Sequence, residues 1–115
     1  MPPHSIKKDP WVHIDDIYDS IKAIKKYTLS LSKADFMASS EKQDAVIRRL
    51  EVIGEAANRL TDDFRSRYPE IPWSGIVGLR NVLIHEYDTI DLDRVWKTIV
   101  KNIPELERQI RKIIE

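Results

Sequence analysis

Apolar residues recur every three or four positions along most of this 115-residue chain, and nowhere do they alternate with polar residues as in a half-buried strand. That spacing gathers the apolar side chains on one face of an α-helix. Four such segments can be traced, so the sequence predicts an all-α protein. The length suits one domain with one core, spanning residues 1–115.

The first two predicted helices are long. The first begins at Asp9-Pro10, a polar cap followed by a proline at an early helical position. The second begins near Ser39-Ser40 and is expected to end by Tyr68, because prolines follow. Their inner faces are predicted to consist of Trp11, Ile14, Ile17, Ile21 and Ile24 in the first helix, and of Val46, Leu50, Ile53, Ala57, Leu60 and Phe64 in the second.

The last two predicted helices differ in length. The third is short, begins at Pro72-Trp73 and runs out over residues 85–87. Asp91 is a favourable N-cap for the fourth, and its apolar spacing keeps phase across Pro104, which predicts a kink rather than a break. With short connections, these segments predict an up-and-down four-helix bundle. The expected inner residues are Ile76, Leu79 and Leu83, and then Leu92, Trp96, Ile99, Ile103, Leu106, Ile110 and Ile113; Trp73 is also placed in the core.

The charge balance argues against a broad nucleic-acid-binding face. Nineteen basic residues meet nineteen acidic ones with the signs mixed along the chain, so any nucleic-acid contact is expected in a local cleft or between subunits. The chain has no cysteine, which excludes disulfides, a thiolate nucleophile and a cysteine-based zinc site. It shows no apolar signal segment near its start and no membrane-spanning run, so a cytoplasmic location is expected.

The most informative short segment is Arg80-Asn81-Val82-Leu83-Ile84-His85-Glu86-Tyr87. The guanidinium of Arg80 is a permanent cation with a planar set of donors that fits phosphate oxygens. The imidazole of His85 is suited to proton transfer near neutral pH. Such a pair can support phosphodiester chemistry without a metal.

In this R-x4-H-x-Y pattern, and in the long second and fourth helices that flank it, the chain resembles the HEPN superfamily. The second helix carries Gly54-Glu55-Ala56-Ala57-Asn58. The R-x4-H core is common to HEPN proteins, and the added tyrosine narrows the resemblance to the HepT family of toxins. It extends from the first predicted helix to the last.

The resemblance implies a metal-independent endoribonuclease that needs no cofactor. Arg80 and His85 would act together with the polar residue Asn81, in a homodimer whose two motif copies line one cleft. The partner would be an MntA-like nucleotidyltransferase antitoxin, which transfers AMP from ATP to Tyr87 and so silences the toxin. The RNA target is not identified.

The spacing of Arg80 and His85 favours such a dimer. Five positions correspond to about 140° of rotation on an ideal helix, so the two side chains cannot share one narrow face. Either the helix unwinds before His85, or each residue meets a counterpart from a second subunit across a two-fold axis.

Less specific interpretations remain open. Arg80 would also suit a surface ion pair, His85 a helix C-terminus and Tyr87 the edge of the core. Glu55 and Asn58 are either polar groups at a helix interface or a supporting layer behind the motif. His4 and His13 have no partners at metal-ligand spacing. The alternative function is a non-catalytic HEPN-type dimer that binds RNA or nucleotide, or a subunit that only docks on a partner.

Overall fold

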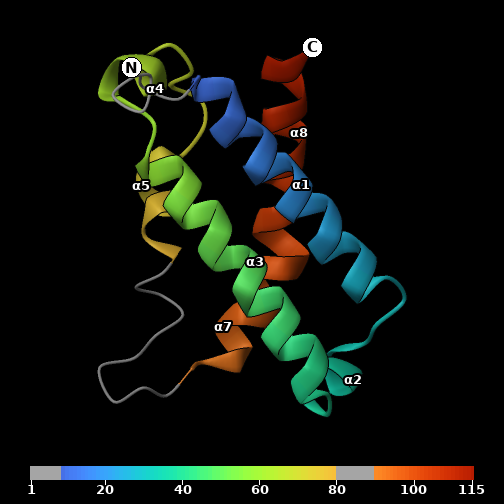
Figure 1. Cartoon of the computed structure of the whole chain (residues 1–115). Coiled ribbons are helices and arrows are strands. Elements are labelled where there is room, and N and C mark those ends of the chain that lie inside the picture. Colours follow the sequence, from blue (N-terminus) through green and yellow to red (C-terminus); the bar gives the residue numbers. More distant parts are fainter. Residues whose placement is uncertain (1–8, 80–89) are drawn as a thin grey trace, which may run out of the picture.

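The computed structural model describes residues 9–79 and 90–115, and within these ranges every regular element is helical. The all-α prediction is therefore confirmed. The chain runs down α1, up α3, down through α5 and up again through α7 and α8 (Figure 1). The elements are α1 (Pro10–Thr28), α2 (Lys33–Met37), α3 (Ser40–Asn58), α4 (Asp62–Ser66), α5 (Trp73–Val77), α7 (Leu92–Lys97), η2 (Thr98–Asn102) and α8 (Ile103–Ile114).

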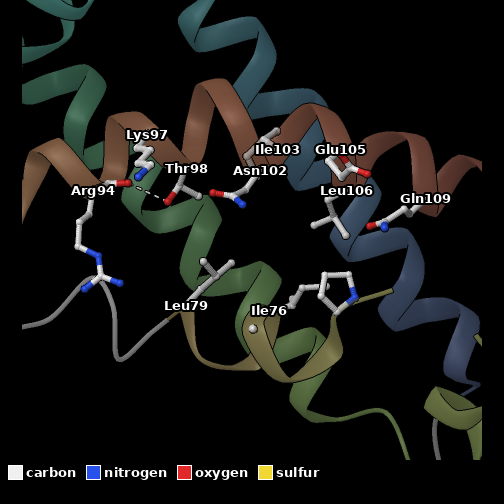
Figure 2. A pocket seen from close by; sticks show the side chains of 12 residues that line it. Ile76, Leu79, Arg94, Lys97, Thr98, Asn102, Ile103, Glu105, Leu106 and Gln109 are labelled. Carbon is white, nitrogen blue, oxygen red and sulfur yellow. Dashed lines mark hydrogen bonds between the residues drawn. The ribbon is translucent and has the colours of Figure 1, made fainter. Parts of the chain in front are cut away.

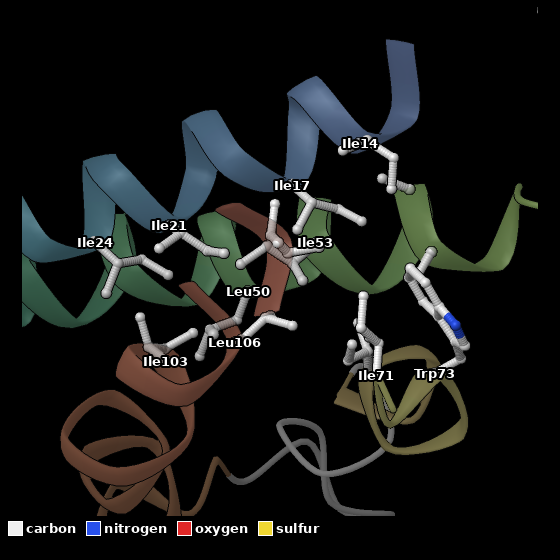
Figure 3. Packing of buried hydrophobic residues seen from close by; sticks show 14 of the residues in the cluster. Ile14, Ile17, Ile21, Ile24, Leu50, Ile53, Ile71, Trp73, Ile103 and Leu106 are labelled. Atoms are coloured by element: carbon white, nitrogen blue, oxygen red, sulfur yellow. The ribbon is translucent and has the colours of Figure 1, made fainter. Parts of the chain in front are cut away.

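The core is formed mainly by α1, α3 and α8. Figure 3 shows the isoleucines of α1 directed toward the apolar residues of α3 and α8. Because these side chains recur at helical spacing, each helix can bury one continuous stripe. The members with no exposed surface include Ile14, Ile17, Ile21, Ile24, Leu50, Ile53 and Ile110.

The second predicted helix is wrong at its C-terminal end. It was expected to continue to Tyr68, but α3 ends at Asn58 and a separate short helix, α4, follows. The hydroxyl of Thr61 accepts a hydrogen bond from the Phe64 N–H at 3.1 Å, which caps the new helix. Leu60 and Phe64 are both buried, so the apolar spacing continues across a break in the backbone.

Two further details of the first half differ from expectation. Trp11 was placed in the core but is 37% exposed, because it lies in the first turn of α1 and contacts Phe64 and Tyr68 only with the edge of its ring. The helix α2 was not anticipated. Its N-terminus is a capping box in which Ser32 and Asp35 each accept a backbone N–H of the other.

The last predicted helix is confirmed as one joined element that is perturbed before Pro104. The helices α7 and α8 are linked by η2, a π-helical segment in which the Ile103 N–H donates to the Thr98 carbonyl, five residues back. A proline in a helix lacks its own N–H and crowds the carbonyl four residues earlier. The wider π-turn accommodates this without ending the helix. Asp91 caps α7 as expected, through a bond from the Arg94 N–H to its carboxylate at 3.2 Å.

Candidate functional site

The residues of the R-x4-H-x-Y motif lie within residues 80–89, outside the part of the chain that the structure describes. The described residues that flank this segment, Leu79 and Ile90, are partly buried and pack against the core. The third predicted helix, which was expected to run out over residues 85–87, is wrong in its length, because α5 ends at Val77 with Gly78 at its C-cap. The roles assigned to the motif stay predictions. The residues concerned are Arg80, Asn81, His85 and Tyr87.

The two residues proposed to support the motif lie at the end of α3. Glu55 is partly buried and Asn58 is exposed. The Asn58 carbonyl accepts a hydrogen bond from the Arg65 guanidinium at 3.1 Å, which ties the end of α3 to α4. Neither of their side chains bonds to another residue in the described ranges, so their supporting role is also untested.

The described residues enclose a groove of about 420 Å³ between α5 and the joined helix α7–η2–α8. Figure 2 shows Ile76 and Leu79 on the α5 side, facing Thr98, Asn102 and Leu106 across the opening. Leu79 directly precedes the motif segment. The groove therefore begins at the residue next to Arg80 in the chain.

The groove changes character along its length. Arg94 and Lys97, both exposed, lie at the α7 end, and Glu105 and Gln109 lie at the α8 end (Figure 2). Between them the lining is mostly apolar and comes from Ile76, Leu79, Ile103 and Leu106. A site with a charged end, an apolar middle and a few polar groups is typical of small-ligand pockets.

The α5 side of the groove is held by a buried tryptophan. Trp73, at the first position of α5, is 7% exposed, and its indole N–H donates to the carbonyls of Arg65 and Tyr68 at 3.1 and 3.0 Å. The two bonds fix the start of α5 against α4. Since α5 has only five residues, this anchor and the burial of Ile76 determine where the α5 wall lies.

The α7 side is held by α2. Phe36 of α2 is fully buried, and the centroid of its ring lies 5.4 Å from the centroid of the Trp96 ring. The Lys33 ammonium pairs with the Asp93 carboxylate at 3.1 Å. The predicted core position of Trp96 is only partly correct, because the side chain is half-buried between α2 and the rest of the core.

The π-helical segment shapes the groove wall. Thr98 is the first residue of η2 and Asn102 is its last, and both line the groove. In an α-helix, four residues rotate through about 400°, which is about 40° more than one full turn. Side chains four residues apart therefore move steadily off one face of the helix. The π-turn rotates less per residue, which keeps Arg94, Thr98, Asn102 and Leu106 on the groove side. The Thr98 hydroxyl also donates to the Arg94 carbonyl at 2.8 Å.

Sequence reasoning missed this groove. Its residues are spread over residues 72–109, and no local spacing relates α5 to α8. The one usable signal was Pro104 in an otherwise regular helix, since a proline there commonly marks a perturbed turn.

The arrangement defines a class of protein: a small helical bundle that has a partly cationic groove and whose sequence carries a motif suited to phosphate chemistry. No described helix combines the length and apolar character needed to cross a membrane. Within residues 9–79 and 90–115, no three His, Cys, Asp or Glu side chains gather as metal ligands would.

The chain belongs to the HepT-like family. The family described as "Ribonuclease HepT-like" matches residues 17–113, which includes the motif and both walls of the groove. The predicted resemblance is thereby confirmed. No solved structure gives a significant match.

Individual relatives agree with this assignment. The chain is 38% identical to "Putative RNase MJ0127" of Methanocaldococcus jannaschii, over 95% of this chain and 90% of the relative. It is also 38% identical to "Probable ribonuclease HepT" of Thermococcus cleftensis, over 88% of this chain and 92% of the relative. A third relative, "Gamma-glutamylcyclotransferase and putative RNase MJ0434" of M. jannaschii, is 41% identical over 96% of this chain, but the chain spans only half of its length.

Proposed function

We propose that this protein is a metal-independent endoribonuclease toxin that cleaves RNA through Arg80 and His85. It acts as a homodimer in which the two copies of the motif line one cleft. The proposal rests on one combination: the chain belongs to the HepT-like ribonuclease family, and it carries R-x4-H-x-Y intact.

The chemistry follows from the side chains. The 2′-oxygen of a ribose attacks the adjacent phosphorus, a new O–P bond forms, and the bond to the 5′-oxygen of the next nucleotide breaks. His85 takes the 2′-hydroxyl proton or supplies one to the leaving 5′-oxygen. Arg80 stabilises the negative charge that builds on the phosphoryl oxygens, and Asn81 orients the phosphate or the imidazole. The products are a 2′,3′-cyclic phosphate and a free 5′-hydroxyl.

Tyr87 provides the off-switch. Its phenolic oxygen attacks the α-phosphorus of ATP in the active site of an MntA-like nucleotidyltransferase, and pyrophosphate leaves. The attached AMP adds bulk and a negative charge two residues from His85. A phosphate there competes with the RNA phosphate for Arg80.

The first experiment measures cleavage of structured and unstructured RNA in the presence of EDTA. The wild-type protein is expected to cut RNA but not DNA, and His85→Ala is expected to lose about 10²- to 10⁴-fold in rate. His4→Ala is the matched control, because it removes a histidine outside the motif. Absence of cleavage by the wild type, or equal cleavage by His85→Ala, refutes the catalytic assignment.

The second experiment follows the modification by mass spectrometry after incubation with the nucleotidyltransferase and ATP. One AMP per chain is expected on Tyr87 and none on Tyr87→Phe. Tyr68→Phe, outside the motif, is expected to be modified like the wild type. If Tyr87→Phe still gains the mass of AMP, the regulatory assignment is wrong.

A further inference from the structure

The groove between α5 and the joined helix α7–η2–α8 is lined by described residues that have no role in the chemistry proposed above. Its polar residues are arranged in a definite order, with cations at one end and hydrogen-bond acceptors at the other. A ligand that matches this order has a negatively charged group at one end and donors at the other.

No residue of the described ranges neutralises the cationic end by an ion pair. Neither Arg94 nor Lys97 forms an ion pair with any residue of the described ranges, whereas the nearby carboxylates are already engaged. Asp93 pairs with Lys33 at 3.1 Å, and Asp91 accepts the Arg94 backbone N–H at 3.2 Å. Two cations one helical turn apart, with no ion-pair partner among the described residues, attract an anion at this end of the groove, and phosphate suits both a guanidinium and an ammonium.

The middle of the groove offers an apolar surface. Ile76 and Leu79 contribute from one wall, and Ile103 and Leu106 from the other. Ile76, Ile103 and Leu106 are at most 5% exposed, so they are packed in the core and present only a small apolar surface to the opening. A flat heterocyclic ring can bury its faces there, whereas a bare phosphate or sugar gains nothing from such a surface.

The α8 end carries an acceptor that lacks a donor. The Gln109 amide nitrogen donates to the Glu70 carbonyl at 3.1 Å, which fixes the orientation of the amide group. Its Oε1 is then buried and accepts no hydrogen bond within the described ranges. A buried acceptor without a donor is costly, and a ligand N–H would satisfy it. The carboxylate of Glu105, paired with Arg108 at 2.9 Å, adds a second acceptor at this end.

We propose that this groove binds one nucleotide of an RNA strand, with its phosphate on Arg94 and Lys97 and its base against the apolar lining. The amino edge of the base faces Gln109. The inference rests on the proposed function, because RNA is named as the occupant. Since Leu79 lines the groove and Arg80 follows it, the bound nucleotide belongs to the same strand that is cut, outside the cleavage step itself. A free nucleotide shares this chemistry, and the test separates the two.

The test measures binding without cleavage. A short, fluorescently labelled single-stranded RNA with methylated 2′-hydroxyls cannot be cut, and its binding is followed by anisotropy across a range of salt concentrations. The double variant Arg94→Ala/Lys97→Ala is expected to bind about tenfold more weakly, with a salt slope reduced by about 0.7, the value for one phosphate contact on a single strand. The matched control is Arg111→Ala/Lys112→Ala, which removes the same two residue types from the exposed end of α8.

Several outcomes overturn the proposal. If RNA binding is weakened equally in both double variants, the effect comes from the net charge of the protein and not from the groove. If Arg94→Ala/Lys97→Ala binds RNA as tightly as the wild type, RNA does not occupy the groove. AMP that binds more tightly than the RNA makes a free nucleotide the occupant. A change in the mass of the assembly, measured by light scattering, makes the groove an interface between copies.

The orientation of the base has its own test. An adenine-containing strand is expected to bind about three- to tenfold better than one with purine riboside, which lacks the amino group, and Gln109→Leu is expected to abolish this preference. Equal binding of the two strands by the wild type contradicts the orientation.

The binding assay also distinguishes this proposal from the proposed function. His85→Ala is expected to bind the methylated RNA like the wild type. A wild-type protein that binds in the groove but cuts no RNA refutes only the catalytic proposal. A protein that cuts RNA with Arg94 and Lys97 replaced, and binds it normally, refutes only the groove.

Discussion

The two sides of this molecule are built in different ways. On one side, α1, α3 and α8 bury long stripes of isoleucine and leucine that are at most 5% exposed. On the other, α5 and α7 have only five and six residues and are positioned by a few specific contacts. The first side obtains its stability from apolar burial, while the second leaves polar groups available at a groove. Core burial is thus concentrated in α1, α3 and α8, and α8 contributes both to the core and to the wall of the groove.

A core truncation should have the largest effect on stability. Leu50 of α3 is fully buried between α1 and α8, and Leu50→Ala is expected to lower the free energy of unfolding by about 2–5 kcal/mol. Chemical denaturation measures this loss. Val52→Ala, at a partly buried position on the same helix, should cost clearly less. Similar losses at both positions would contradict the assignment of the stability of this side to full apolar burial.

Much of this framework was predictable from the sequence, because apolar spacing is a local signal. The spacing correctly indicated α1, the start of α3, the Asp91 cap and the continuation past Pro104. It could not reveal the break after Asn58, since Leu60 and Phe64 stay in phase across it. The cue there was Thr61, a good cap followed by two aspartates.

The groove was not predictable for a different reason. Gln109 lies near α5 only because the chain reverses direction between them, and its bond to the Glu70 carbonyl spans 39 residues. The motif residues could be proposed from the sequence because their chemistry is contained within eight positions. Short-range chemistry can be read from a single sequence, whereas a site formed by tertiary packing cannot.

Replacing Trp73, which anchors α5, should have the second-largest effect on stability. Trp73→Phe removes the two hydrogen bonds from the indole N–H to the carbonyls of Arg65 and Tyr68, which each still accept a backbone N–H. At about 0.5–1.5 kcal/mol per bond, the loss is expected to cost about 1–3 kcal/mol. Trp11→Phe is the matched control, because Trp11 is 37% exposed and touches its neighbours only edge-on. It should change stability by less than ~0.5 kcal/mol. If both replacements cost the same, α5 is not held by the indole bonds.

The cap of α7 should have a smaller effect. Asp91→Ala removes the acceptor of the Arg94 N–H and is expected to cost about 1 kcal/mol, whereas Asp91→Asn should retain most of the stability. The control is Asp93→Ala, which breaks only the exposed pair with Lys33 and should cost under ~0.5 kcal/mol. Hydrogen exchange would locate the loss. Exchange that rises in α1 rather than in α7 would refute a local role for the cap.

The smallest expected change concerns the cations of the groove, and it is the most direct test of the comparison. Arg94→Ala/Lys97→Ala breaks no ion pair in the described ranges, and alanine has a higher helix propensity than either residue. The helix continues from α7 into η2, so neither cation faces the end of a helix dipole. Thermal unfolding is therefore expected to shift by the equivalent of less than ~0.5 kcal/mol.

Lys25→Ala provides the contrast, because its ammonium pairs with Glu107 of α8 at 2.8 Å, and the Glu107 side chain is only 17% exposed. That replacement is expected to cost up to ~1 kcal/mol. If the groove variant instead loses more stability than Lys25→Ala, Arg94 and Lys97 serve the fold. If the groove variant keeps its stability but binds RNA more weakly, Arg94 and Lys97 contribute to ligand binding and not to the fold. Single charged residues then differ in role in the same way as the two sides of the molecule.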